Sequence, residues 1–118
     1  MPHPQIDAAR LTVFPLAERR SLTRIETIAA DPNAPPRPVG EPLAEKVQRV
    51  AGRMRAAQES GAAVMLAYGA HLVKNGGGPL VNRMIERGAI THLATQGAGV
   101  IHDWEFAFLG ASTESVRE

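Results

Sequence analysis

Apolar side chains first recur at a regular period after residue 40. Alternating steps of four and three favour a single amphipathic helix there, with Pro42 in its first turn and Gly61 at its end. Charged side chains take the other faces. A solvated face is the simplest interpretation of the arginines among them, and an anion site is the less favoured one. The apolar stripe consists of Leu43, Val47, Val50, Met54 and Ala57.

The pattern changes at residue 62. Residues 62–68 are continuously apolar, which is typical of a strand buried on both faces. A helix over 80–87, a strand over 90–95 and a helix over 100–109 follow, separated by glycine. The order strand–helix–strand–helix predicts two parallel strands joined by a right-handed crossover, and therefore an α/β fold.

The first forty residues are organised differently. Eight of the nine prolines precede residue 43, so residues 1–40 are predicted to form a Pro-rich extended arm ahead of the α/β domain over 41–118. Within the arm, residues 11–16 favour a short strand, and residues 22–28 favour either a strand or a helical turn. A plain linker is the favoured interpretation of residues 31–38, with a wrapping segment as the alternative.

Composition narrows the classes of function. The 118 residues suit one domain, and a balance of 13 Lys and Arg against 12 Asp and Glu offers no electrostatic case for nucleic acid or an anionic membrane. The absence of cysteine excludes disulfides, thiol catalysis and Cys-ligated metals. The sequence has neither a long apolar run nor a signal-like start, so a cytoplasmic location is expected.

Two glycine-rich turns, residues 69–78 and 96–99, follow the predicted strands. In an open parallel sheet, ligands bind beyond the carboxyl ends of the strands, so both turns are candidate sites. Three consecutive glycines ending at Gly78 permit close backbone approach, and Lys74 offers a charge for a phosphate. The first turn lacks the Walker A spacing, and a flexible turn with an exposed lysine is the alternative.

The second turn has the first two glycines of a dinucleotide fingerprint, Gly97 and Gly99, with His102 where the third belongs. Main-chain donors over residues 97–99 are candidates for binding a pyrophosphate or ribose. The side chains of Thr95 and Gln96 could add hydrogen bonds to the same ligand.

The predicted helix over 100–109 is apolar around nearly its whole circumference, which is typical of a buried helix. Asp103 is therefore informative. The favoured interpretation is a partner of the helix dipole or a cap, and the alternative is a carboxylate that binds a cationic substrate. Three of the five aromatic residues lie in this helix: Trp104, Phe106 and Phe108.

Histidines supply the candidate proton acceptors. His102 lies at the predicted start of the helix, where its neutral form is favoured, and it shares a face with Glu105. It is interpreted either as a proton acceptor or as a structural histidine. His71 has the same two interpretations, and His92 is expected to be structural. A metal is not expected, because no second pair of this kind exists.

Residues 67–76 (Ala-Tyr-Gly-Ala-His-Leu-Val-Lys-Asn-Gly) and residues 90–105 resemble the deoxyhypusine synthase family. They are most similar to its bacterial deoxyhypusine synthase-like branch, as are residues 14–19 and 110–116. The resemblance covers nearly the whole chain. It implies a Rossmann-like parallel β-α-β-α unit that binds NAD, and a homotetramer with active sites between subunits.

The resemblance also implies an activity. Enzymes of this family oxidise spermidine with NAD and pass the aminobutyl group, through an imine on an enzyme lysine, to an amine acceptor. Carried over to this chain, the cofactor would be held by residues of the two turns, and a polyamine would meet Asp103 and Glu105, with His102 as proton acceptor. Taken from the two glycine turns and the resemblance together, the cofactor residues would be His71, Lys74, Gly76, Thr95, Gln96, Gly97, Gly99 and Asp103.

Some positions depart from the family pattern. His71, Lys74 and Asn75 differ in the first turn, and Ile101 and His102 replace two carboxylates that would suit a polyamine cation. Family members are also longer, and their imine-forming lysine lies in a carboxyl-terminal part that this sequence does not match. The chain is therefore expected to be an amino-terminal part, inactive alone and completed by a homo-oligomer or a separate carboxyl-terminal half.

Two other functions remain open at this stage. One is a non-catalytic nucleotide-binding or assembly module that keeps the fold without the reaction. The other is an enzyme that uses the glycine turns for a phosphorylated metabolite. In each case the apolar helix over 100–109 needs more cover than two strands provide.

Overall fold

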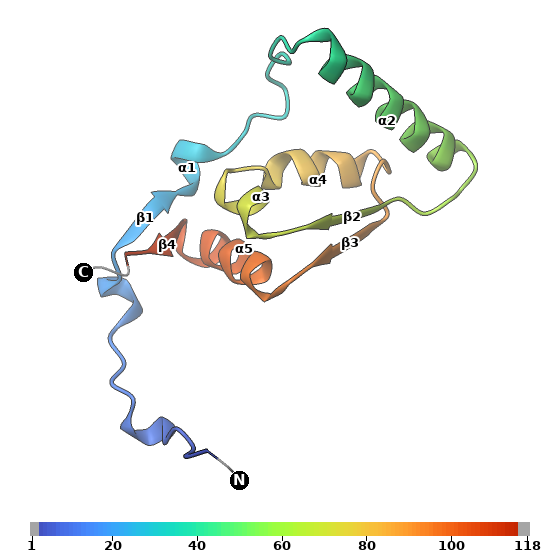
Figure 1. Ribbon diagram of the computed structural model, residues 1–118. Helices are drawn as coiled ribbons and strands as arrows, with labels where there is room; N and C mark the ends of the chain where they lie inside the picture. Colours follow the sequence, from blue (N-terminus) through green and yellow to red (C-terminus); the bar gives the residue numbers. More distant parts are fainter. Residues whose placement is uncertain (1–2, 116–118) are drawn as a thin grey trace.

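The computed structural model describes residues 3–115, which form a mixed α/β fold with two small sheets (Figure 1). Val116, the last residue of the tail that resembles the family, lies outside this range. The strands are β1 (Ser21–Arg24), β2 (Met65–Tyr68), β3 (His92–Thr95) and β4 (Ala111–Glu114). The helices are α1 (Ile25–Ile28), α2 (Glu41–Glu59), α3 (Ala70–Lys74), α4 (Gly78–Glu86) and α5 (Gly97–Leu109), with 3-10 turns η1 (Ala8–Arg10) and η2 (Leu16–Glu18).

Strands β2 and β3 pair in parallel, as their order along the chain predicts. Met65 lies opposite His92 and Tyr68 opposite Thr95, while α3 and α4 carry the chain from the end of β2 back to the start of β3. The Val64 amide donates to the Thr91 hydroxyl (2.9 Å) just before the pair begins. Both strands are shorter than the apolar segments that predicted them.

The prediction that the first of these strands is buried on both faces is wrong for this chain. Met65 is 65% exposed, and all four residues of β3 are exposed. The apolar run is real, but within residues 3–115 β2 has β3 as its only neighbouring strand, and the pair stays largely exposed. The continuous apolar pattern records a surface suited to burial and does not say what buries it.

A second sheet pairs a strand of the amino-terminal region with the last strand, β4. Strand β1 pairs antiparallel with β4, with Thr23 opposite Ser112, and the Ile25 amide donates to the Gly110 carbonyl (2.9 Å). Residues 22–28 thus contain both alternatives, a strand followed by one helical turn. Residues 11–16 form no strand, contrary to the weak pattern there. Folding back at β1 leaves the part of the arm before this strand extending away from the body (Figure 1).

The core lies where α3, α4, α5 and β4 meet. It is small, and its members come from both halves of the parallel unit. Its buried apolar side chains are Ala70, Val73, Val81, Ile90, Phe106 and Ala111. Phe106 is buried on α5, the helix that packs against α3.

Much apolar surface stays uncovered. The accessible surface of 9602 Å² exceeds the roughly 6,200 Å² that a compact monomer of this mass exposes. The radius of gyration of 19.1 Å likewise exceeds the roughly 13.5 Å of a compact chain. Helix α2 has the predicted bounds, but Leu43, Val47 and Val50 on its apolar stripe are each more than half exposed. Within residues 3–115, no helix combines the length and apolar character needed to cross a membrane.

Candidate functional site

The two strand-to-helix turns lie side by side at one edge of the parallel sheet. Tyr68 and Thr95 are the last residues of β2 and β3 and lie opposite each other, so the residues that follow the two strands lie at the same edge of the sheet. A Cβ added at Gly69 would lie 3.8 Å from Nε2 of the Gln96 side chain. The predicted adjacency of the two turns is therefore confirmed.

The first turn is more ordered than its glycine content suggests. Residues 70–74 form α3, so the irregular part is confined to residues 75–77, and the prediction of one long loop over 69–78 is wrong. The amides of Gly76 and Gly77 donate to the carbonyls of Val73 (2.9 Å) and Leu72 (2.9 Å). These two donors are consumed within the chain and are not free to bind an anion.

Gly76 has a packing role. Its φ of +77° suits glycine, and a Cβ there would lie 1.9 Å from the Ile28 carbonyl oxygen. The Gly76 carbonyl accepts from the Ala30 amide (2.9 Å). The backbone after α1 is therefore seated directly on this turn, and only a residue without a side chain permits that approach.

The second turn is built by Thr95, Gln96 and Gly99. The Thr95 hydroxyl donates to the Tyr68 carbonyl (2.9 Å), and a Cβ at Gly99 would meet that hydroxyl oxygen at 2.1 Å. The Gln96 side chain caps α5 by accepting from the Ala98 amide (2.6 Å). Thr95 and Gln96 thus serve the turn itself, and their predicted ligand contacts would have to be made in addition.

Gly97 is the open position of this turn. A side chain there would meet no atom within 4 Å, and Gly97 is the first residue of a 13-residue helix. The cap and first turn engage the amides of Ala98 and Gly99, which lie behind it. The first amides of a helix have no acceptor within the helix, and the open space beside Gly97 leaves room there for an anionic or polar group.

Asp103 does not cap α5. The helix begins at Gly97, earlier than predicted, so Asp103 lies in its second turn and Gln96 is the cap. Asp103 is exposed and lines a shallow hollow of about 220 Å³ between α5 and the first turn. The hollow is otherwise mainly apolar, with Ile25, Val73, Gly78, Pro79, Asn82, Phe106 and Ala107 at its wall.

His102 also moves off the helix start, so the dipole argument for its neutral form loses force. It belongs to a buried group that we call the Arg19 cluster: Arg19, His102, Glu105 and Ser112. The Ser112 hydroxyl lies 2.6 Å from His102 Nδ1 and donates to Glu105 Oε2 at 2.5 Å. The other carboxylate oxygen, Oε1, accepts from Arg19 Nη1, and Arg19 Nη2 donates to the Ser21 hydroxyl (3.2 Å).

Burial alone would raise the pKa of Glu105. Hydrogen bonds from Arg19 and Ser112, together with the positive charge of Arg19 and that of His102 whenever its imidazole is protonated, outweigh it and hold the pKa of that carboxyl below its ordinary value. Glu105 is therefore ionised near neutral pH, with internal partners on both oxygens. Both carboxylate oxygens of Glu105 thus bind groups of the chain itself, whereas the resemblance implied a direct contact between Glu105 and the substrate.

The cluster has the residue types of a hydrolase triad but not its arrangement. Ser112 is 0% exposed, so its hydroxyl cannot reach a substrate. The carboxylate of Glu105 bonds the serine, whereas in such a triad it would orient the histidine. Nucleophilic catalysis by Ser112 is excluded on these two grounds.

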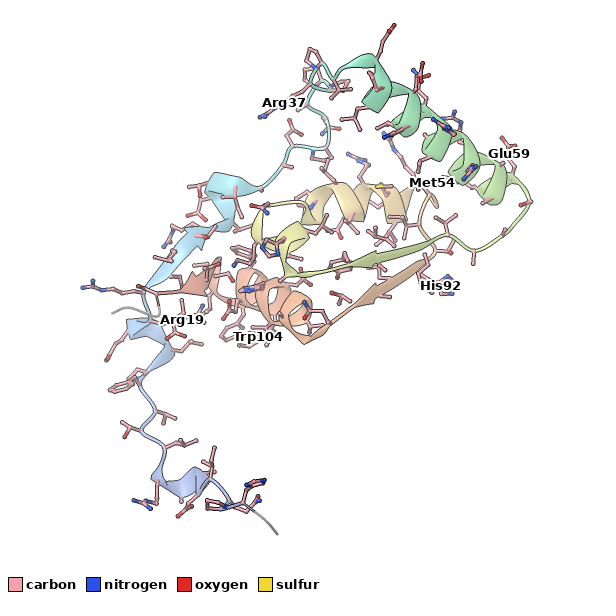
Figure 2. All side chains as sticks on the ribbon, in the orientation of Figure 1. Arg19, Arg37, Met54, Glu59, His92 and Trp104 are labelled. Carbon is pink, nitrogen blue, oxygen red and sulfur yellow. The ribbon has the colours of Figure 1, made fainter. Side chains whose placement is uncertain are left out.

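The remaining predicted residues lie around this edge or away from it. His71 and Lys74 lie on α3, three residues apart, with His71 exposed and Lys74 half-buried. His92 is at the opposite end of β3 from the glycine turn, which agrees with its exclusion from the site (Figure 2). Its Nδ1 is 2.9 Å from the Thr91 hydroxyl.

Sequence reasoning did not identify Arg19 or Ser112 as site residues. Arg19 lies 86 residues before Glu105, and Ser112 is in a strand whose polar sequence shows no strand periodicity. One signal was available: a carboxylate in a helix as apolar as α5 requires a partner. Figure 2 shows Arg19 beside β4, where the amino-terminal arm meets the body.

Comparisons with protein-family models, curated proteins and solved structures found no match.

Proposed function

We propose that this chain forms the amino-terminal part of the NAD site of a deoxyhypusine synthase-like protein with a Rossmann-like fold. The reaction would be NAD-dependent transfer of an aminobutyl group from a polyamine such as spermidine to an amine acceptor. The imine-forming lysine would come from outside these residues, because neither Lys46 nor Lys74 stands in a matching motif.

One observation carries the proposal: two strand–turn–helix units end at the same edge of a parallel pair, in register at Tyr68 and Thr95. Ligands of open parallel sheets bind at this edge, since helix starts and turn amides converge there. The open position at Gly97 and the close approach of Gly99 to Thr95 match two of the roles that glycines play in a dinucleotide turn, room for the ligand and close packing of the helix on the strand.

The residues fit the cofactor in part. Gly97 would face the phosphates, while Thr95, Gln96 and Gly99 would hold the turn in shape around it. Gly76 would act by seating the first turn, since its own amide is occupied. His71 and Lys74, on α3 beside this edge, would add polar and positive groups.

An alkylammonium substrate would meet Asp103. Its carboxylate is exposed at the wall of a mainly apolar hollow, which suits a cation on an alkyl chain. NAD supplies the hydride acceptor when bound. The nitrogen of an amine must be unprotonated for such an oxidation, so His102 would accept the proton that the ammonium group loses.

Calorimetric titration of the folded chain with NAD tests the site. Binding is expected for the wild type and is expected to be lost in Gly97→Asp, where a negative charge would stand at the start of α5. Gly52→Asp is the matched control, because Gly52 in α2 also has open space beside it. A folded wild-type chain that does not bind NAD would overturn the proposal.

A second measurement separates an enzyme from a nucleotide-binding module. The chain is incubated with NAD and spermidine, alone and with a carboxyl-terminal half of a family member, and 1,3-diaminopropane is measured. Release only in the mixture supports a catalytic role completed by another polypeptide. NAD binding without release in either sample supports the non-catalytic module.

A further inference from the structure

The Arg19 cluster joins three elements around one imidazole. His102 and Glu105 come from α5, Ser112 from β4, and Arg19 from the segment between η2 and β1. The side chains of Arg19, His102 and Glu105 are only 15%, 19% and 11% exposed, and Ser112 is fully buried. The nitrogen that meets this group is Nδ1 of His102; it lies 2.6 Å from the Ser112 hydroxyl oxygen and 3.4 Å from Glu105 Oε2.

Counting protons decides who donates. A serine hydroxyl has one hydrogen to give, and an ionised carboxylate has none. The Ser112 hydroxyl gives its hydrogen to Glu105 Oε2, 2.5 Å away, since otherwise two oxygens would face each other at that distance with no proton between them. The Ser112 oxygen must therefore accept from His102, and Nδ1 must carry the hydrogen.

We propose that Glu105 and Ser112 are positioning residues that hold neutral His102 as its Nδ1–H tautomer, leaving Nε2 as the proton-accepting nitrogen. The chain of donation runs from Nδ1–H of His102 to the Ser112 oxygen and from the Ser112 hydroxyl to Glu105. Which ring nitrogen of a histidine is protonated is set by the bond that the other nitrogen makes. The tautomer is a property of this chain alone, but its use in catalysis rests on the proposed function.

The arrangement suits a base. When Nε2 takes a proton from an alkylammonium group, the amine becomes neutral and His102 becomes an imidazolium, with no other bond broken. The new positive charge lies next to the Ser112–Glu105 unit, and the Nδ1–H bond is already directed at it. Arg19 holds the other carboxylate oxygen, so Glu105 keeps its orientation in both states of the histidine.

The backbone around Ser112 fixes the same geometry. Thr113, the next residue, has φ +64°, a conformation that β-branched residues strongly disfavour. Within the described residues, its buried hydroxyl has no hydrogen-bond partner. Strain of this kind persists where surrounding contacts over-determine the chain, and here those contacts are the β1–β4 pairing and the Arg19 cluster.

Nitrogen-15 NMR of the full chain, at a pH where the imidazoles are neutral, tests the tautomer directly. For His102 we expect a pyrrole-type shift at Nδ1 and a pyridine-type shift at Nε2, the reverse of the tautomer that free histidine favours. The exposed His71 serves as an internal reference and should show the usual order. A pyridine-type Nδ1 at His102 in the wild type would overturn the proposal.

The double variant Arg19→Met/Glu105→Leu removes the anchor without leaving a lone buried charge, so it is expected to fold. The Ser112 hydroxyl is then free to donate to Nδ1, and the two His102 shifts should exchange. The matched control is Arg24→Met/Glu26→Leu, which deletes an exposed ion pair and should leave His102 unchanged. A double variant that folds and keeps the Nδ1–H tautomer would contradict the role of Glu105.

These outcomes are separate from those of the NAD titration. A chain that shows the Nδ1–H tautomer but does not bind NAD retains the positioning unit and loses the proposed function. A chain that binds NAD with the opposite tautomer retains the function and loses the positioning unit.

Discussion

Helix α5 has one face with buried polar side chains and one face with exposed apolar side chains. This is the reverse of the usual amphipathic arrangement, in which the apolar face is buried. The inner face, toward β4 and α3, carries His102 and Glu105 beside the buried Phe106. The outer face is apolar and exposed, and Trp104 stacks there on Phe108 with ring centroids 5.0 Å apart. The exposed side chains of that face are Val100 (57%), Ile101 (56%), Trp104 (53%) and Phe108 (68%).

Each face of α5 matches a different requirement. Polar groups can be buried on the inner face because Arg19 and Ser112 complete their hydrogen bonds within the chain. The outer face leaves contiguous apolar side chains in water, which marks surfaces that bind something else. A homo-oligomer, which the resemblance implies, is a proposal that such a face supports.

The largest expected difference between the faces comes from two phenylalanines two residues apart. Phe106→Ala should lower the free energy of unfolding by about 3–5 kcal/mol, because a buried ring leaves a cavity in a small core. Phe108→Ala should cost less than about 1 kcal/mol, since that ring is already mostly in water. Urea unfolding followed by circular dichroism measures both. Equal losses would mean that the outer face is covered in solution.

A second test concerns the close contact between the backbone at the end of α1 and the first glycine turn. Gly76→Ala places a Cβ against the Ile28 carbonyl and forces a positive φ on alanine, so a loss of about 3 kcal/mol is expected. Gly97→Ala is the control, with open space and a helical position, and should change stability by less than about 0.5 kcal/mol. Thermal unfolding of both variants at one pH gives the difference, and similar midpoints would contradict the close seating of Ile28.

The part of the molecule that sequence could predict is the part with local periodicity. Helix α2 depends on spacing within one segment, and the parallel pair and the adjacency of the two glycine turns depend on the order of two consecutive strand–helix units, so the sequence pattern reveals them. The requirement at Gly99 is also local, because Thr95 is only four residues away. Short-range patterns thus determined the candidate site at the sheet edge.

The inner face of α5 could not be predicted in this way. Its partners come from residues far apart in sequence, Arg19 before β1 and Ser112 in β4, and neither lies in an apolar pattern. The prediction that apolar side chains would be buried was wrong for a different reason. The apolar character of Met65 or Trp104 records that a side chain is suited to being covered, while cover depends on what packs there.

Acid should weaken the inner face selectively. The pKa of Glu105 is lower in the folded chain than its ordinary value of 4.5, so its stabilising contribution is complete above that value. The contribution is lost as the pH falls from about 4.5 through the lower folded value. Unfolding free energies measured across this range should fall more steeply for the wild type than for Glu105→Gln. Glu26→Gln, at an exposed carboxyl whose pKa Arg24 also lowers, is the control and should differ little from the wild type.

The smallest expected effect is a gain at the residue beside Ser112. Thr113→Gly removes a β-branched side chain from a conformation with φ +64° and deletes a buried hydroxyl that has no partner among residues 3–115. The free energy of unfolding should rise by about 1 kcal/mol, because relief of strain exceeds the added entropy of the unfolded chain. Thr113→Ala keeps the positive φ and loses only the hydroxyl and methyl groups, so it should gain less. If Thr113→Gly gains stability but disturbs the His102 tautomer, the strained backbone is what holds Ser112 at the imidazole; if the tautomer stays, the Arg19 cluster holds the inner face without it.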